Sequence, residues 1–140
     1  MKRLIIVAIG IVAMMACKKG LTSESPVQDP IDTATTITKY TGNFMNGPYG
    51  AVTGTAKIIV DSGHYRVALV DVQISNGPDL HVYLAREREP AHFIDLGKLK
   101  STSGTQLYPI TSVPDFTQYK YVLVHCQKFN HLFGSAAIEP

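Results

Sequence analysis

Short segments with alternating apolar and polar side chains fill the sequence from residue 40 to its end. Residues 51–61 alternate in this way, and after a turn signal at residues 61–63 a second segment follows at residues 64–74. Alternation with a period of two is typical of strands that bury one face. No stretch of ten or more residues in this region has an apolar stripe at helical spacing. The sequence therefore predicts an all-β domain, because a packed helix needs such a stripe.

Further strands are expected on the same grounds, separated by residues that favour turns. Several short strands with turn signals every 8–12 residues or so are typical of an antiparallel sandwich or barrel. We expect a small antiparallel β-sandwich or barrel of about seven to eight strands over residues 39–140. The remaining strands are expected near residues 42–44, 79–85, 92–100, 105–110, 119–126 and 133–138.

The N-terminus has the pattern of an export signal. Lys2 and Arg3 precede an unbroken apolar run at residues 4–16, which is shorter than a membrane span and typical of a signal peptide. Ala16 directly before Cys17 resembles the bacterial lipobox, in which the cysteine is lipidated and the peptide before it is removed. We therefore expect a lipoprotein signal peptide at residues 1–16. An ordinary signal cut elsewhere, or an uncleaved anchor, would leave a cysteine at this position unexplained.

Residues 17–38 are expected to be the lipidated N-terminus and a flexible linker. They are rich in Ser, Thr, Asp and Pro and have no apolar periodicity. The chain is then a lipid-anchored protein of the bacterial cell envelope, bound to the bilayer through Cys17. Lys18 stands where some bacteria use Asp for inner-membrane retention, so we expect the outer membrane, facing the periplasm or the exterior. Without residues 1–16 the chain has 11 basic and 11 acidic residues. It therefore has no excess of positive charge that would favour binding to nucleic acid.

Common enzyme motifs are missing from the sequence. It has no nucleophile elbow, P-loop, HExxH or CxxC. The acidic residues Asp61, Asp71, Asp79 and Asp95 fall at turns or strand ends, with no spacing that pairs two of them. An ordinary hydrolase is therefore not expected, and redox chemistry is the remaining candidate class for an enzyme.

Cys126 is left without an intramolecular disulfide partner if Cys17 carries lipid. Alternation along residues 121–126 places Val122, Val124 and Cys126 on one face and His125 on the other. Two interpretations stay open. Cys126 is either a small buried core residue or a redox thiol at a strand end, where Lys128 or a protonated histidine would favour the thiolate.

A metal site is the further alternative. Cys126, His131 and His81 supply the Cys and His ligands of a type 1 copper site on a β-sandwich. The ligand loop of such sites usually closes with Met, and here Leu132 and Phe133 follow. Copper is for that reason the weaker of the cofactor hypotheses.

Several blocks together resemble the DM13 domain family over residues 40–138. The most specific are residues 76–84, NGPDLHVYL, and residues 121–129, YVLVHCQKF, followed by FGSA at residues 133–136. The resemblance implies a small extracytoplasmic β-rich domain, proposed for electron transfer, whose signature cysteine acts as a redox thiol or holds a prosthetic group such as haem. That cysteine corresponds to Cys126, and His125 stands where the family commonly has an aromatic residue.

The resemblance favours a membrane-anchored redox or electron-transfer module that acts through Cys126 with an unidentified redox or protein partner. Any haem would be bound non-covalently with Cys126 as axial ligand, because the chain has no CxxCH motif. The alternative is a non-catalytic binding or adhesion domain with a structural buried cysteine. Gly77, Pro78 and Asp79 are expected to form a structural turn, capped by Asp79. Gly134 is expected to let the last strand pass close to a neighbour or to a bound group.

Overall fold

The computed structural model describes residues 20–140, and over this range the chain forms nine strands and no helix. The predicted signal peptide and Cys17 lie outside the described residues. No helix that could cross a membrane occurs between residues 20 and 140. The strands are β1 (Val27–Gln28), β2 (Thr36–Asn46), β3 (Val52–Asp61), β4 (His64–Ile74), β5 (Leu80–Ala85), β6 (Phe93–Lys98), β7 (Ser103–Pro109), β8 (Tyr121–Cys126) and β9 (His131–Ala137).

All nine strands belong to one sheet with the order β1-β7-β4-β3-β2-β9-β8-β5-β6. The β1–β7 pair is parallel and the other pairs are antiparallel. The expected all-β, antiparallel architecture is confirmed. The ninth strand is β1, which lies in the segment expected to be a linker.

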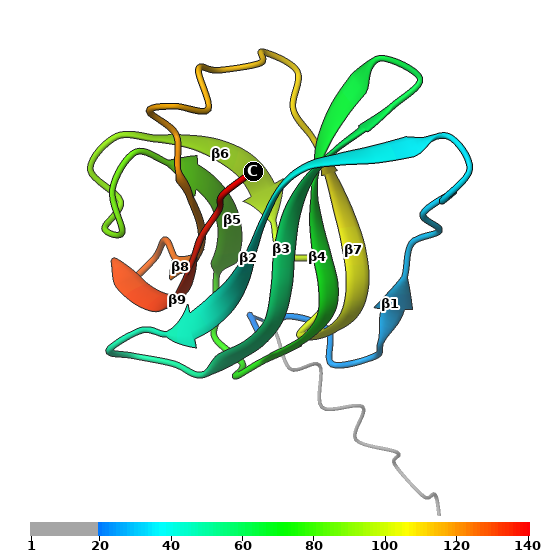
Figure 1. The fold of residues 1–140 in the computed structure, drawn as a ribbon. Coiled ribbons are helices and arrows are strands. Elements are labelled where there is room, and N and C mark those ends of the chain that lie inside the picture. The colour runs from blue at the N-terminus through cyan, green and yellow to red at the C-terminus, as the bar shows by residue number, and fades with distance from the viewer. Residues whose placement is uncertain (1–19) are drawn as a thin grey trace, which may run out of the picture.

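The sheet is curled into a half-barrel, and the long strand β2 belongs to both of its halves (Figure 1). The first part of β2 pairs with β3, and its last three residues, 44–46, pair with β9. Gly42 lies where β2 passes the end of β9, and a Cβ there would be 1.9 Å from the Ala137 carbonyl oxygen. Only glycine fits such a close approach of two backbones.

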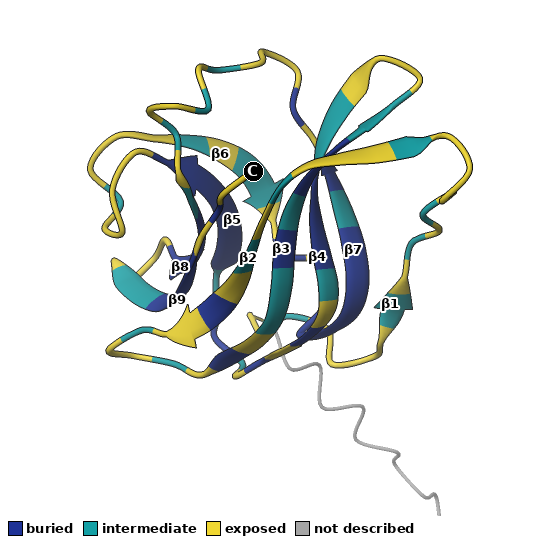
Figure 2. Cartoon of the chain, viewed as in Figure 1, coloured by how far each residue is buried: buried dark blue, intermediate teal, exposed yellow. Residues whose placement is uncertain are grey.

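The main core lies inside the curl and contains buried side chains from both halves of the sheet. Figure 2 shows the buried residues along the strands of both halves. Burying one such aliphatic side chain stabilises the fold by roughly 1.5–3 kcal/mol. From one half the core includes Ala56, Ile58, Val67 and Leu69, and from the other Leu80, Val82, Leu84, Val122, Val124 and Cys126.

Strands β5 and β8 are also covered on their outer face. A second, smaller apolar cluster there contains Tyr83, Ala85 and Leu123, with Tyr121 and Leu132 packed against it. Every residue of β5 is buried as a result. The histidines on this outer face, His81 of β5 and His125 of β8, are therefore held away from water, and the candidate site is built around them.

Residues 20–37, expected to be part of a flexible linker, lie against the edge of the sheet. Val27–Gln28 pairs with β7, and the Asp29 carboxylate accepts a hydrogen bond from the Leu107 amide at 2.9 Å. The same carboxylate binds the ammonium group of Lys100. β2 already begins at Thr36. These contacts involve backbone and polar atoms, so they leave no apolar pattern in the sequence.

Candidate functional site

Cys126 is the last residue of β8, and its side chain lies in the main core with 1% exposure. It is a free cysteine. Val122 and Val124 share its core cluster, which confirms the face predicted for it by alternation. Residues 127–130 follow as an exposed turn into β9. The thiol is therefore buried, although the next residue, Gln127, is exposed at the surface.

His81 lies on the outer face of β5 and is held between two carboxylates. Its Nδ1 is 3.0 Å from Asp95 Oδ2, and its Nε2 is 3.3 Å from Asp79 Oδ1. The imidazole is 7% exposed. Both of its nitrogens have a charged partner, so the ring orientation is fixed and a protonated ring would be paired on each side. The fold thus joins two carboxylates that sequence spacing could not pair.

Tyr83 lies next to His81 on the same face and is 1% exposed. Its hydroxyl accepts a hydrogen bond from Gln127 Nε2 at 3.1 Å, and the same amide nitrogen is 3.4 Å from Asp95 Oδ2. Burial raises the pKa of Tyr83, and the nearby Asp95, Asp79 and Cys126 raise it further. We call Asp79, His81, Tyr83, Asp95 and Gln127 the outer-face cluster.

Sequence reasoning found only part of the outer-face cluster. The sequence indicates His81 as a candidate metal ligand and predicts a strand near residues 79–85, in which residues two apart, such as His81 and Tyr83, share a face. Asp95 and Gln127 carried no such signal, because their approach depends on how β6 and β8 pair with β5.

His125 lies directly across from His81, on the outer face of β8, and is 3% exposed. Its Nε2 is 3.0 Å from Asn130 Oδ1. Its Nδ1 is buried and has no hydrogen-bond partner among residues 20–140. Burial lowers the pKa of His125, so the ring is neutral at pH 7. Leaving a buried acceptor unpaired costs about 1–3 kcal/mol, and such an atom in a native structure calls for an explanation.

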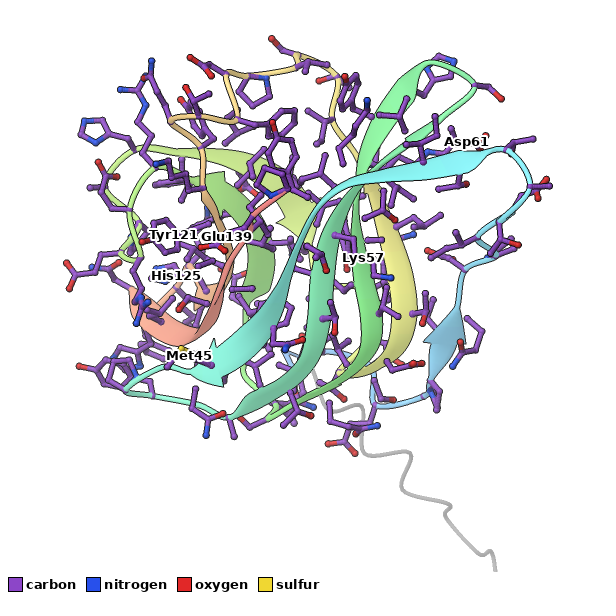
Figure 3. All side chains as sticks on the ribbon, in the orientation of Figure 1. Met45, Lys57, Asp61, Tyr121, His125 and Glu139 are labelled. Carbon is purple, nitrogen blue, oxygen red and sulfur yellow. The ribbon has the colours of Figure 1, made fainter. Side chains whose placement is uncertain are left out.

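A surface cavity of about 510 Å³ adjoins His125. It lies over the outer face of β8 and β9, between the β2–β3 loop and the β5–β6 loop. Figure 3 labels His125 in the half of the curled sheet that contains β8 and β9. The volume is in the range of pockets for small molecules. The lining residues are Asn46, Gly47, Pro48, Tyr49, Arg88, Glu89, Pro90, Ala91, His125, Asn130, Leu132 and Ser135. We call this the His125 cavity.

The three residues named for copper do not meet at one point. Cys126 and His131 are register partners across β8 and β9, but Cys126 lies in the main core and the His131 ring stacks on Tyr49, with the ring centroids 3.7 Å apart. His81 is held between carboxylates on the other face of the sheet. Over the described range, no group of three or more His, Cys, Asp and Glu side chains could hold a metal ion. This arrangement does not fit a type 1 copper centre, which needs its ligands on one metal.

A haem ligated by Cys126 does not fit this arrangement either. The thiol is surrounded by the packed side chains of the main core. Cys126 lines neither the His125 cavity nor the surface cavities beside Phe116 and Leu21. A porphyrin would have to displace much of that core to reach the sulfur.

The expected structural turn is present, but its cap is Asn76. Asn76 Oδ1 accepts a hydrogen bond from the Gly77 amide at 2.8 Å, while the Asp79 carboxylate faces His81. Gly134 packs closely against the neighbouring strands, because a Cβ there would lie 2.5 Å from Val52 Cγ2. Close strand packing is therefore the role of Gly134 in this structure.

Comparison with known proteins identifies the family. No curated protein and no solved structure gives a match to this chain. A family model described as Electron transfer DM13 matches residues 43–138, which is more than half of the chain. The matched range includes Cys126, the outer-face cluster and His125. The chain therefore belongs to the DM13 family of electron-transfer domains.

Proposed function

We propose that this chain is an electron-transfer module of the bacterial cell envelope, anchored by lipid on Cys17, in which Cys126 is the redox group. The observation that carries the proposal is the free Cys126 thiol at the end of β8, within the family match. Its sulfur lies in the core beside an exposed turn, so a single local movement would open a path to it.

A domain with one cysteine cannot complete a two-electron thiol cycle alone. In exchange chemistry, the Cys126 thiolate would attack a partner disulfide, form a mixed disulfide and release one partner thiolate. A second thiol must then resolve the mixed disulfide, and this domain has none, because the other cysteine of the chain is the proposed lipid site. The partner therefore supplies the resolving thiol.

Burial restricts how a partner reaches the sulfur. A mixed disulfide requires direct contact between two sulfur atoms, and Cys126 is 1% exposed. The exposed turn at residues 127–130 is the element whose opening uncovers the end of β8. Local openings of this kind occur well below the free energy of global unfolding.

Envelope anchoring is the second part of the proposal. It rests on the sequence, in which Ala16 and Cys17 close an apolar run in the manner of a lipobox. Several acyl chains on one cysteine would give stable anchoring, since one chain alone binds membranes weakly. The outer membrane is the expected site, because Lys18 follows Cys17.

The test of the redox role uses the full chain expressed in a bacterial envelope and extracted with detergent. Native labelling with a thiol reagent, and mixed-disulfide formation with glutathione disulfide followed by mass spectrometry, are compared for the wild type and a Cys126→Ala variant. A labelled thiol or a mixed disulfide in the wild type alone supports the proposal. A thiol that reacts with neither reagent until the chain is unfolded overturns it. Membrane fractionation of a Cys17→Ala variant tests the anchor separately.

A non-catalytic binding domain with a structural cysteine is the second candidate. It is favoured by the burial of Cys126 and by the His125 cavity, which does not contain the thiol. Under this function the Cys126→Ala variant keeps every binding property of the wild type.

A further inference from the structure

The unpaired Nδ1 of His125 determines which hydrogen-bonding group a ligand needs. The Nε2–H of the neutral imidazole donates to Asn130 Oδ1, so Nδ1 carries a bare lone pair. This lone pair is the one buried side-chain polar atom without a partner in residues 20–140. It can accept a hydrogen bond but cannot donate one. A matching ligand therefore presents a hydroxyl or N–H donor.

The walls of the His125 cavity define the rest of the ligand. Pro48, Pro90 and Leu132 give the cavity apolar sides. Tyr49 stands at its edge as a flat ring, already stacked on His131. Arg88 and Glu89 bring opposite charges to the same wall, so the cavity has no net preference for an ion. Flat, neutral and largely apolar molecules suit such walls.

We propose that the His125 cavity binds a small neutral aromatic alcohol, of the phenol, naphthol or hydroquinone class, whose hydroxyl donates to His125 Nδ1. The cavity volume of about 510 Å³ accommodates one or two rings. This proposal does not involve the thiol, because Cys126 faces the core and His125 faces the cavity.

Nδ1 is buried, so binding requires a movement of the cavity wall before a ligand hydroxyl can reach it. Tyr49 is 57% exposed and belongs to the β2–β3 loop, and Arg88 is exposed on the β5–β6 loop. Side chains on surface loops shift easily compared with core residues. The strand that carries His125 stays in place.

The test uses 2-naphthol as the probe and 2-methoxynaphthalene as its matched partner without a donor. Both are titrated into the full chain, and binding is followed by calorimetry and by the ¹⁵N resonances of the histidine rings. We expect saturable binding of 2-naphthol, at least roughly tenfold tighter than binding of the methoxy compound. The His125 Nδ1 resonance should move with 2-naphthol alone.

Two variants test the site from different sides. His125→Phe keeps a ring on β8 and removes the acceptor, and we expect roughly a tenfold loss of 2-naphthol affinity. Ala91→Trp fills the cavity from an exposed loop position and leaves His125 intact, so it remains informative if the first variant misfolds. His64→Phe, at an exposed site on β4, is the control that should bind normally.

The proposal is overturned by equal affinity for the two naphthalenes, by no saturable binding, or by wild-type affinity in both cavity variants. A firmly held water at Nδ1 that 2-naphthol does not displace overturns it as well. The Cys126→Ala variant separates the two proposals. It should lose mixed-disulfide formation and still bind 2-naphthol, so failure of either proposal can be recognised by itself.

Discussion

His125 and Cys126 are consecutive residues of β8, yet the sheet places their side chains on opposite faces. The Cys126 thiol belongs to the main core, and the His125 ring borders the outer-face cavity. Backbone pleating separates them, although both are almost fully buried. The thiol and the cavity can therefore be altered one at a time, and the predictions below use this independence.

The first prediction concerns the surroundings of Cys126. Replacing it with Ala removes one sulfur atom and leaves a small void, at a cost of about 1 kcal/mol. Replacing it with Ser puts a hydroxyl among aliphatic side chains, and we expect a cost of about 1–3 kcal/mol beyond that of Ala. Urea unfolding measures both. A Ser variant as stable as the Ala variant would show that a hydrogen-bonding partner reaches this position.

The strands were predictable from the sequence because their signals are local. Residues 51–61 alternate, residues 64–74 are rich in β-branched and apolar side chains, and turn residues bound both segments. β3 and β4 occupy almost the same residues. β1 was missed because two residues held by backbone pairing leave no side-chain pattern. β7 begins at Ser103, two residues before the strand expected at residues 105–110. The Ser103 hydroxyl donates to the Glu24 carbonyl of the N-terminal segment, and such a polar contact leaves no apolar signal in the sequence.

The candidate site was only partly predictable. Alternation gave the face of Cys126 correctly, because it needs no knowledge of neighbouring strands. The pairing of Asp79 and Asp95 on His81 depends on the register of β5 and β6, which shifts between His81 and Tyr83. The burial of His125 depends on neighbouring outer-face side chains and on loops near the cavity, and no periodicity reports those contacts.

The second prediction concerns Gly134. A Cβ at this position would lie 2.5 Å from Val52 Cγ2 and 3.0 Å from the Met45 carbonyl oxygen. We expect Gly134→Ala to lower the free energy of unfolding by about 1–3 kcal/mol through overpacking. In a Val52→Ala background the Cγ2 contact is gone, but the contact with the residue-52 Cβ at 2.7 Å stays, so the same change should cost somewhat less. Equal costs in both backgrounds would place the strain at that Cβ and at the Met45 carbonyl oxygen instead.

The third prediction concerns the attachment of the N-terminal segment. Asp29→Ala removes the acceptor of the Leu107 amide and the partner of Lys100. We expect hydrogen exchange at Leu107 to become roughly tenfold faster. Asp32→Ala is the control, because its carboxylate accepts only from the local Ala34 amide. Unchanged exchange at Leu107 would show that the segment is held by other contacts.

Low pH should also weaken the contacts through which Asp29 holds the N-terminal segment. The hydrogen bond with Lys100 is the main cause that lowers the pKa of Asp29 below 3.8 in the folded chain. The ionised Asp29 carboxylate therefore stabilises the fold above pH 3.8, and this stabilisation is lost as the pH falls through the lowered pKa of Asp29 in the folded chain. Exchange at Leu107 in the wild type should approach that of Asp29→Ala over this range.

The last prediction concerns the pH dependence contributed by His125. Burial lowers its folded pKa below the ordinary value of 6.5, so between these two values the unfolded chain binds a proton that the folded chain does not. The free energy of unfolding should therefore fall as the pH drops below 6.5, until the folded ring is protonated too. His125→Gln should lose this component, whereas His64→Gln, at an exposed position, should keep it. Urea unfolding of the three proteins at pH 7.5 and pH 5 gives the comparison. An identical pH response in the wild type and His125→Gln would mean that the ring is protonated equally well in the folded and unfolded chains, and the assignment of Nδ1 as a bare acceptor would then be wrong.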